Sequence, residues 1–349
     1  MTTLDATSPH TSGGEPEPNP APHRPATRKR SLVHWLAIDR FSGIYIIVVL
    51  IALFMLWIPE TFGTSTNGRA LIAGQAITGV IALAATISLI SGVFDLSIAA
   101  TMAVSISVCG QLQAVVGLNP WLTVLCCLGI GAVIGVINAI IVTRLQIDPV
   151  IGTLAMSAIL AAVTYWVASG QSILYGFDPG FVKLGASEPF GIPFTLIILI
   201  VLAALLWYVL EQTPIGRYLY AAGANPQAAK LSGVRVGRLT WGALITSGIL
   251  AAAAGVVLTM QVGSAPFQGG LPYLLPAYSA AFLGATQIQP GRFNILGTLV
   301  AIYVVAVAVK GLQLKFPESP WVTDLVQGTI LLIAVSFAVW ATRRRASSS

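Results

Sequence analysis

Residues Glu211 to Thr240 read EQTPIGRYLYAAGANPQAAKLSGVRVGRLT and form a polar interruption between two strongly apolar runs. Only 9% of the residues of the chain are charged, yet four basic residues fall in this stretch: Arg217, Lys230, Arg235 and Arg238. A loop this basic, between two membrane-spanning segments, is expected on the cytoplasmic side of a membrane.

The same stretch predicts a short helix inside that loop. Asn225 followed by Pro226 is typical of an N-cap and a first helical position. Residues 227–231 then continue as a helix, and Ser232-Gly233 end it. A short helix in a cytoplasmic loop is well placed to be presented to a partner.

The composition is that of a polytopic membrane protein. Of the 349 residues 56% are hydrophobic, and the mean hydropathy is +0.85, whereas a soluble protein has about 45–50% apolar residues even with glycine included. Lys and Arg total 18 against 12 Asp and Glu. In a soluble protein this excess would suggest nucleic acid. Here it is explained by cytoplasmic loops, and no nucleic-acid partner is expected.

The predicted fold is an all-α integral membrane protein with about ten transmembrane helices, since each span needs about 20 apolar residues. The predicted spans are 42–58, 70–90, 94–116, 120–143, 149–168, 193–210, 240–260, 273–287, 293–314 and 322–341. Residues 1–40 are predicted to be a disordered cytoplasmic tail because they contain no apolar run. Residues 41–341 are the predicted membrane domain, and residues 342–349 a short cytoplasmic tail.

The distribution of basic residues gives an independent check on this topology. With ten spans and both termini in the cytoplasm, three basic residues lie outside, namely Arg69, Lys183 and Lys315, and Lys310 lies within or at the end of a span. All the others fall in the cytoplasm: Arg24, Arg28, Lys29, Arg30, Arg40, Arg144, Arg217, Lys230, Arg235, Arg238, Arg292, Arg343, Arg344 and Arg345. This asymmetry favours an even number of spans with cytoplasmic N- and C-termini.

No pattern of catalytic residues is present. The chain has no Walker A loop, no HExxH motif, no paired carboxylates at useful spacing and no Ser/His/Asp arrangement. Its three histidines, His10, His23 and His34, lie in or beside the N-terminal tail. We therefore expect no enzymatic activity, no metal site and no cofactor, which disfavours an integral-membrane enzyme.

Asp95 is the notable ionisable residue within the apolar segments. A carboxylate at membrane depth is costly and marks a functional site by default. The alternative is that Asp95 ends one helix and caps the next, with Ser97 or backbone N–H groups as partners. Other polar residues in spans either line a solute pathway or hydrogen-bond between helices. The candidate pathway residues are Asp95, Ser97, Gln75, Asn138 and Thr153.

The scarcity of such residues bears on the energy source. A proton- or sodium-driven carrier usually has acidic or histidine side chains in several helices, and this chain shows about one. The energy source is then expected to lie outside the chain, and the short helix of the cytoplasmic loop would receive force from a separate ATPase. An ion-coupled secondary carrier of a small polar solute is the alternative.

Three stretches resemble a known family. Residues 213–233 (TPIGRYLYAAGANPQAAKLSG) resemble the T-x-x-G-R-x-x-x-A-x-G-x-N-x-x-A-A-x-x-S-G loop of the permease subunits of bacterial ABC importers for monosaccharides, of the ribose/xylose/galactose type in the branched-chain-transport permease superfamily. Residues 91–97 (SGVFDLS) and 280–297 (AAFLGATQIQPGRFNILG) resemble two further family segments, and together the likeness covers roughly residues 40–340.

The resemblance implies a type II ABC importer-like permease that pairs with an identical or paralogous permease. It also implies an ATP-binding subunit and an external solute-binding protein that delivers a monosaccharide-like solute. The loop helix would then be the coupling helix that contacts the ATPase. The residues expected to couple the chain to the ATPase are Gly216, Arg217, Gly223, Asn225, Pro226, Ala228, Ala229, Leu231, Ser232 and Gly233.

The sequence also departs from the family pattern. Phe94 stands where isoleucine is usual, and residues 98–100 (IAA) and 285–290 (ATQIQP) replace glycine-containing segments. These departures leave the solute open, with polyols, nucleosides and sugar-derived signal molecules as further candidates. They are also compatible with one half of a heterodimer.

Overall fold

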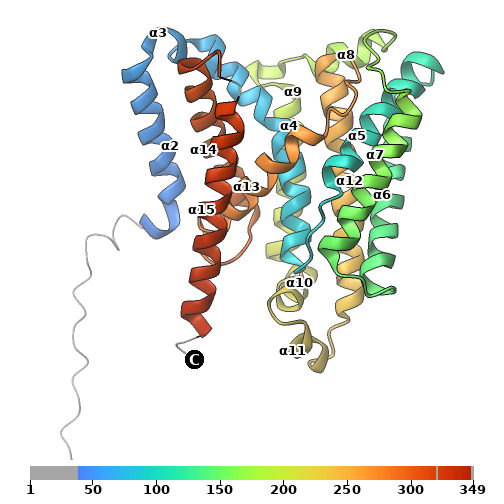
Figure 1. Ribbon diagram of the computed structural model, residues 1–349, viewed down its shortest axis with the longest axis vertical. Helices are drawn as coiled ribbons and strands as arrows, with labels where there is room; N and C mark the ends of the chain where they lie inside the picture. The colour runs from blue at the N-terminus through green and yellow to red at the C-terminus, as the bar shows by residue number, and fades with distance from the viewer. Residues whose placement is uncertain (1–37, 320, 347–349) are drawn as a thin grey trace, which may run out of the picture. The chain divides into compact units, whose positions relative to one another are not determined.

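A computed structural model describes residues 38–319 and 321–346, so that most of the expected N-terminal tail lies outside the described residues. The described part of the chain contains helices and no strand, apart from one isolated bridge between Ile173 and Ala265 (Figure 1). The α-helices are α2 (Ile38–Trp57), α3 (Pro59–Phe62), α4 (Ser65–Ile90), α5 (Ile98–Gly110), α6 (Pro120–Thr143), α7 (Pro149–Ala168), α8 (Pro179–Gly185), α9 (Phe194–Trp207), α10 (Pro214–Ala224), α11 (Pro226–Leu231), α12 (Val236–Val262), α13 (Leu274–Gly284), α14 (Ile295–Lys315) and α15 (Trp321–Ala346).

Four short π- or 3-10 segments complete the helical elements. Two of them, η1 (Gln111–Val115) and η3 (Tyr208–Gln212), extend α5 and α9, whereas η2 (Pro189–Gly191) and η4 (Leu271–Tyr273) lie in connections. The C-terminal helix α15 continues to Ala346, so it covers residues 342–346 of the predicted C-terminal tail. Residues 347–349 of that tail lie outside the described residues.

A helix is present in each of the ten predicted ranges, but not every one crosses a membrane as a continuous helix. Seven described helices are long and apolar enough to do so, and the apolar stretches Phe41–Trp57 and Trp321–Ser336 are shorter. Helix α13, predicted as a span over 273–287, has 11 residues. At 1.5 Å per residue it covers about half of a 30 Å hydrocarbon layer.

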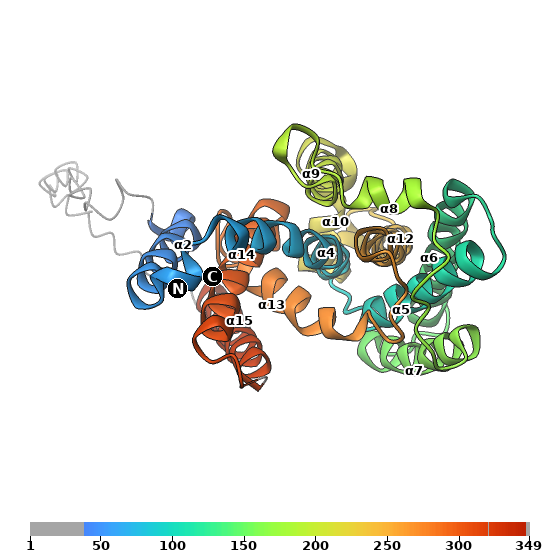
Figure 2. The same ribbon diagram turned by 90° about the horizontal axis from the view of Figure 1, so that it is seen from above.

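Two membrane segments are interrupted. Helix α4 ends at Ile90, where the predicted span 70–90 ends, and the chain turns at Gly92 with φ +80°; the next span was predicted to begin at residue 94, but α5 begins only at Ile98. Both α5 and α13 begin within the layer, at a level part-way along the length of the neighbouring longer helices (Figure 1). Seen from above, these two helices lie between α15 and α7 (Figure 2). The non-helical stretches before α5 and α13 therefore lie inside the helical layer.

Helix α12 is central to the packing of the layer. It contacts α4, α5 and, most extensively, α6. Helices α6 and α12 cross closely at three glycines, Gly131 and Gly135 on α6 and Gly248 on α12. A side chain at any of these glycines would overlap the backbone of the opposite helix. Small residues allow such close approach of membrane helices. The largest apolar cluster includes Ile81, Ile98 and other buried residues of α4, α5 and α12.

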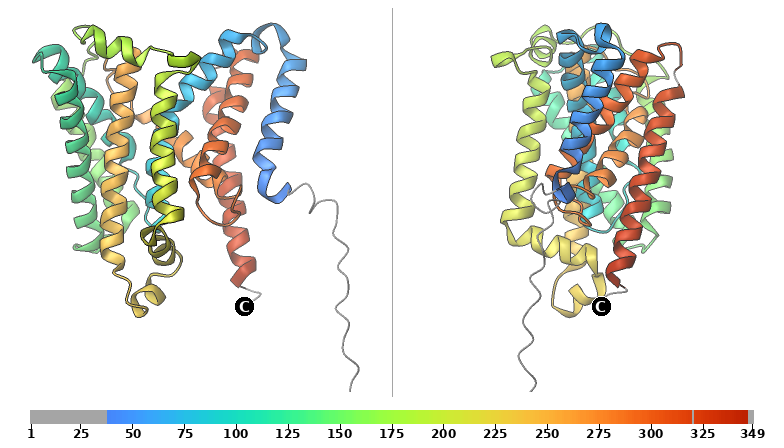
Figure 3. Two further views of the ribbon diagram at one scale, coloured as in Figure 1. Left: turned by 180° about the vertical axis from the view of Figure 1, so that it is seen from behind. Right: turned by 90° about the vertical axis from the view of Figure 1, so that its left-hand side faces the viewer.

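The short helices α10 and α11 lie at one end of the layer (Figure 3). The beginning of α2 and the end of α15 lie toward the same end (Figures 1 and 3). Helices α3 and α8 lie at the opposite end (Figure 1). The two ends of the layer thus carry different elements.

Candidate functional site

Asp95 is the centre of a buried polar cluster. Its side chain is 1% exposed. Oδ1 accepts hydrogen bonds from Ser97 Oγ at 2.6 Å, from Ser97 N at 3.2 Å and from Asn138 Nδ2 at 3.4 Å. Oδ2 accepts one from Ser247 Oγ at 2.8 Å. Both carboxylate oxygens therefore have partners, as a buried polar group requires.

The cluster joins five elements. The segment between α4 and α5 contributes Asp95 and Ser97, α6 contributes Asn138, and α12 contributes Ser247. Next to them the backbone N–H of Asp95 donates to Tyr278 Oη of α13 at 3.2 Å. The N–H of Leu96 donates to Thr153 Oγ1 of α7 at 3.0 Å. The non-helical segment is thus fixed to three long helices and to α13.

Four of the five candidate pathway residues come together here: Asp95, Ser97, Asn138 and Thr153. Gln75 does not, since it lines a separate cavity together with residues of α13, α14 and α15. Sequence reasoning missed Ser247 and Tyr278. A serine or a tyrosine in an apolar helix is too common to mark a site, and only the fold brings these two to Asp95.

Helix α11 has the local structure that the sequence predicted. Asn225 Oδ1 accepts hydrogen bonds from the N–H groups of Gln227 and Ala228 at 3.1 and 3.0 Å, and Pro226 is the first helical residue. At the other end Ser232 Oγ donates to the carbonyl of Ala228, and Gly233 turns the chain with φ +82°.

The exposure of α11 is one-sided. Ala229 is buried, whereas Ala228 and Lys230 are exposed, and Leu231 is 91% exposed. Arg217, on α10, is exposed as well.

Helix α10 joins α11 to the end of α4. A side chain on Gly223 would overlap the carbonyl oxygen of Ile90, so the backbones of α10 and α4 are in contact there. The same glycine faces Gly92, where a Cβ would lie 3.3 Å from Gly223 Cα. At the start of α10, Gly216 is similarly close to the carbonyl of Leu210. The turn at Gly92, which leads to Asp95, is therefore in direct contact with α10.

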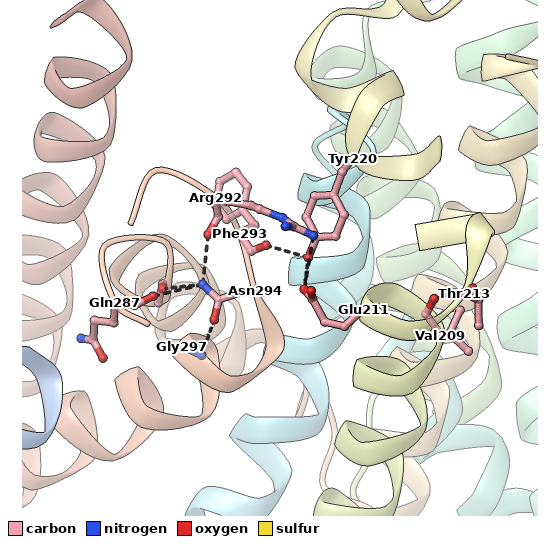
Figure 4. A network of polar contacts seen from close by, with 10 residues as sticks. Val209, Glu211, Thr213, Tyr220, Gln287, Arg292, Phe293, Asn294 and Gly297 are labelled. Atoms are coloured by element: carbon pink, nitrogen blue, oxygen red, sulfur yellow. Dashed lines mark hydrogen bonds and ion pairs between the residues drawn. The ribbon is translucent and has the colours of Figure 1, made fainter. Parts of the chain in front are cut away.

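Helix α10 also contacts the loop between α13 and α14 (Figure 4). Tyr220 Oη donates a hydrogen bond to the carbonyl oxygen of Phe293 at 3.0 Å. Arg292 lies over the Tyr220 ring, 3.4 Å from its centroid, and its Nη2 lies 3.3 Å from Glu211 Oε1. Burial raises the pKa of Tyr220 to about 12, so that the phenol stays protonated and able to donate.

The loop itself is held by Asn294. Its side-chain amide donates to the carbonyls of Gly284, Gln287 and Arg292, and its Oδ1 accepts from the N–H of Gly297 at the start of α14 (Figure 4). These bonds keep the end of α13 and the beginning of α14 together. Sequence reasoning did not find this joint: Asn294 fell inside the predicted span 293–314, and an asparagine carries no signal of which carbonyls its amide will reach.

A line of aromatic rings connects the loop to the Asp95 cluster. Phe293 packs edge-on against Phe282 of α13, with ring centroids 5.4 Å apart. Phe282 and Tyr278 both stack on Phe94, with centroids 6.0 and 6.2 Å apart. Aromatic contacts of this geometry are favourable beyond the area they bury. Helix α10 is thus connected to the Asp95 segment by two routes, one through α4 and one through α13.

The fold and these sites define a class: a polytopic α-helical membrane protein in which an exposed pair of short helices is joined to interrupted membrane helices. The chain belongs to the family described as the branched-chain amino acid transport system / permease component, whose profile matches residues 69–335.

Curated relatives agree with this assignment. The fructose import permease protein FrcC of Rhizobium meliloti is 34% identical over 276 residues, covering 76% of this chain and 75% of that protein. The ribose import permease protein RbsC of Bacillus subtilis (strain 168) is 34% identical over 297 residues, covering 84% and 90%. The autoinducer 2 import system permease protein LsrD of Photorhabdus laumondii is 29% identical, covering 74% and 78%.

Proposed function

We propose that the chain is the membrane-spanning subunit of an ATP-driven importer for a monosaccharide or a similar hydroxylated solute. The names of its relatives support this, since they are import permeases for fructose, ribose, allose and autoinducer 2. In this assembly a separate subunit hydrolyses ATP, an external binding protein delivers the solute, and a second permease completes the membrane part.

The single observation that carries the proposal is that the exposed helix α11 follows directly on α10, and that α10 contacts both the end of α4 and the α13–α14 loop. We propose that α11 is the coupling helix and that α10 transmits its movement to the membrane segments. Helix α10 contacts the end of α4 and is hydrogen-bonded to the α13–α14 loop. A movement of α11 would therefore be transmitted both to the segment before α5 and to α13.

The proposed topology has ten crossings with both ends of the chain in the cytoplasm. It is supported by the start of α2 and the end of α15, which lie toward the end that carries α10 and α11. It is also supported by Arg217, Lys230, Arg235 and Arg238, which lie on or beside α10 and α11, whereas Arg69 and Lys183 belong to α4 and α8 near the opposite end. A crossing need not be one continuous helix, since non-helical backbone is tolerated at membrane depth where protein surrounds it.

The role we propose for the Asp95 cluster is structural. The carboxylate is buried and each of its oxygens already accepts hydrogen bonds, which leaves it no free direction toward a solute. The cluster fixes the segment before α5 to α6, α7 and α12, so that a shift of α4 is passed to these helices.

The docking surface is tested by a pull-down of the detergent-solubilised chain from its native membrane. The double substitution Arg217→Glu and Lys230→Glu reverses two exposed charges beside α11 and is expected to abolish co-purification of an ATPase subunit. The matched control, Arg69→Glu with Lys183→Glu, reverses two charges at the opposite end and should retain it. Equal recovery of the ATPase with both variants would contradict the docking site.

Tyr220→Phe tests the route through α13. The substitution removes the hydrogen bond to the Phe293 carbonyl, together with the longer contact of 3.5 Å to Glu211 Oε1, and keeps the ring under Arg292, so that the expected loss is about 1 kcal/mol. In proteoliposomes we expect fewer solute molecules imported per ATP hydrolysed, with folding unaffected. The exposed Tyr218 of the same helix provides the control Tyr218→Phe. An unchanged ratio of uptake to hydrolysis in Tyr220→Phe would remove this route from the mechanism.

A further inference from the structure

A cavity with both polar and apolar lining residues lies in the half of the helical layer opposite α10 and α11. Its volume is about 360 Å³, and it is bounded by the first half of α4, the start of α13, the last turns of α14 and the first turns of α15. This size falls at the lower end of the range of small-molecule pockets. The polar residues that line it include Gln75, Thr78, Tyr273, Lys310, Thr323 and Gln327.

Lys310 is the feature of this cavity that needs an explanation. It lies inside α14, more than one turn before the helix ends at Lys315. In the described part of the chain, no carboxylate lies within ion-pairing distance of its ammonium group. A cation inside a membrane segment is costly and is found where it faces a bundle interior or a polar cavity. Lys310 meets that condition because it lines this cavity.

Lys315 shows the contrast on the same helix. Its ammonium lies over the ring of Trp57, 4.9 Å from the centroid, and it is absent from the cavity lining. The position at the end of α14 allows its charge to reach the membrane surface. Lys310 lies deeper and has no aromatic ring of this kind, so its donors remain available to a ligand.

The other lining groups define the class of ligand. Gln75 and Gln327 each provide an amide, which both donates and accepts, and Thr78 provides a hydroxyl that does the same. The half-buried ring of Tyr273 adds an apolar face. Donors and acceptors beside one aromatic ring suit a ring of adjacent hydroxyl groups. They suit an apolar ligand poorly, because its binding would leave these groups without partners.

We propose that this cavity is a binding subsite of the permease for one neutral polyhydroxylated solute, held by Lys310 and Gln327 through its hydroxyl oxygens. This inference rests on the proposed function and extends it, because it places solute recognition in the permease as well as in an external binding protein. Gln75, taken from the sequence as a pathway residue, belongs to this subsite and not to the Asp95 cluster.

Direct binding tests the subsite without a transport cycle. The full-length chain in lipid nanodiscs is titrated with D-ribose and D-fructose by ligand-observed NMR, with gluconate as a charged probe. Binding of ribose or fructose is expected, and Lys310→Met and Gln327→Leu are each expected to weaken it roughly tenfold or more, as for the loss of a hydrogen bond to a charged or buried group. The matched control Lys315→Met, on the same helix outside the cavity, should bind as the unsubstituted chain does.

Three results would overturn the proposal. One is equal affinity of the Lys310→Met and Lys315→Met variants, and another is binding of gluconate alone. The third is that none of the three probes binds. Removing a membrane-embedded cation is expected to leave folding intact, and a melting curve of each variant checks this independently.

Transport separates this inference from the proposed function. In proteoliposomes with the ATPase subunit and binding protein, Lys310→Met is expected to reduce uptake roughly tenfold while binding-protein-stimulated ATP hydrolysis continues. If the unsubstituted assembly imports none of the sugars, the proposed function fails. If it imports them and Lys310→Met imports equally well, the function stands and the subsite is wrong.

Discussion

The substitution Gly223→Leu is expected to abolish solute uptake while the chain remains inserted and folded. A side chain at this position would overlap the carbonyl oxygen of Ile90, which belongs to the backbone and cannot rotate away. Helix α10 and the end of α4 must therefore move apart. Overpacking of this kind typically costs about 1–3 kcal/mol, which a protein of this size can tolerate locally. The contact through which α10 would push α4 is nevertheless lost.

Uptake and ATP hydrolysis are measured together in proteoliposomes for this prediction. We expect ATP hydrolysis to continue without import, because α11 itself keeps its exposed surface. The control is Gly68→Leu on α4, since a side chain there meets open space. Normal uptake by a stably inserted Gly223→Leu variant would show that this contact has no part in coupling.

A bulky substitution of Ala228 is expected to have a different effect from one of Gly223, although both residues lie in the same predicted loop. It is exposed on α11, so a large side chain there strains nothing within the chain. Ala228→Trp is expected to weaken co-purification of the ATPase subunit, whereas Gly223→Leu should retain it. The two variants separate docking from transmission.

The sequence predicted the ranges that hold a helix because length and hydropathy determine where an apolar helix forms, although only seven of the described helices are long and apolar enough to cross a membrane. It separated the spans 70–90 and 94–116 and offered Asp95 as the end of one helix, but it did not predict that α5 would begin only at Ile98 or that α13 would have only 11 residues. Residues 94–97 were counted in the second span, and the length of the break depends on Gly92 at positive φ and on hydrogen bonds to Asp95. Hydropathy does not register a change of backbone direction inside an apolar run.

The local part of the candidate site was also predictable, and the long-range part was not. Asn225 and Pro226 act on their own neighbours, so the cap of α11 could be inferred from their order. Arg292, by contrast, contacts Glu211, which lies 81 positions earlier in the chain, and the ring of Tyr220. In the sequence these three are ordinary polar residues, and only the approach of α10 to the α13–α14 loop gives them a joint role.

Asp95→Ala is expected to destabilise the protein severely, and Asp95→Asn to be nearly neutral. Alanine removes the carboxylate that accepts from Ser97 and Ser247, whereas Asn138 Nδ2 keeps its hydrogen bond to Ser97 Oγ, and each buried group left unpaired costs about 1–3 kcal/mol. Asparagine keeps the shape of the side chain. Its Oδ1 can accept from Ser97, and its amide can donate to Ser247 Oγ, since a hydroxyl both donates and accepts.

The asparagine variant also decides between an ATP-driven importer and an ion-coupled carrier. If Asp95 carried a coupling proton or cation, its charge would be essential and Asp95→Asn would stop transport in a folded protein. If the carboxylate only fixes the segment before α5 to its neighbouring helices, Asp95→Asn should import at close to the unsubstituted rate in an assembly driven by ATP. Uptake and thermal melting of both variants are therefore measured side by side. A well-folded but inactive Asp95→Asn would favour the carrier, because a hydrogen-bonding role alone does not require the charge.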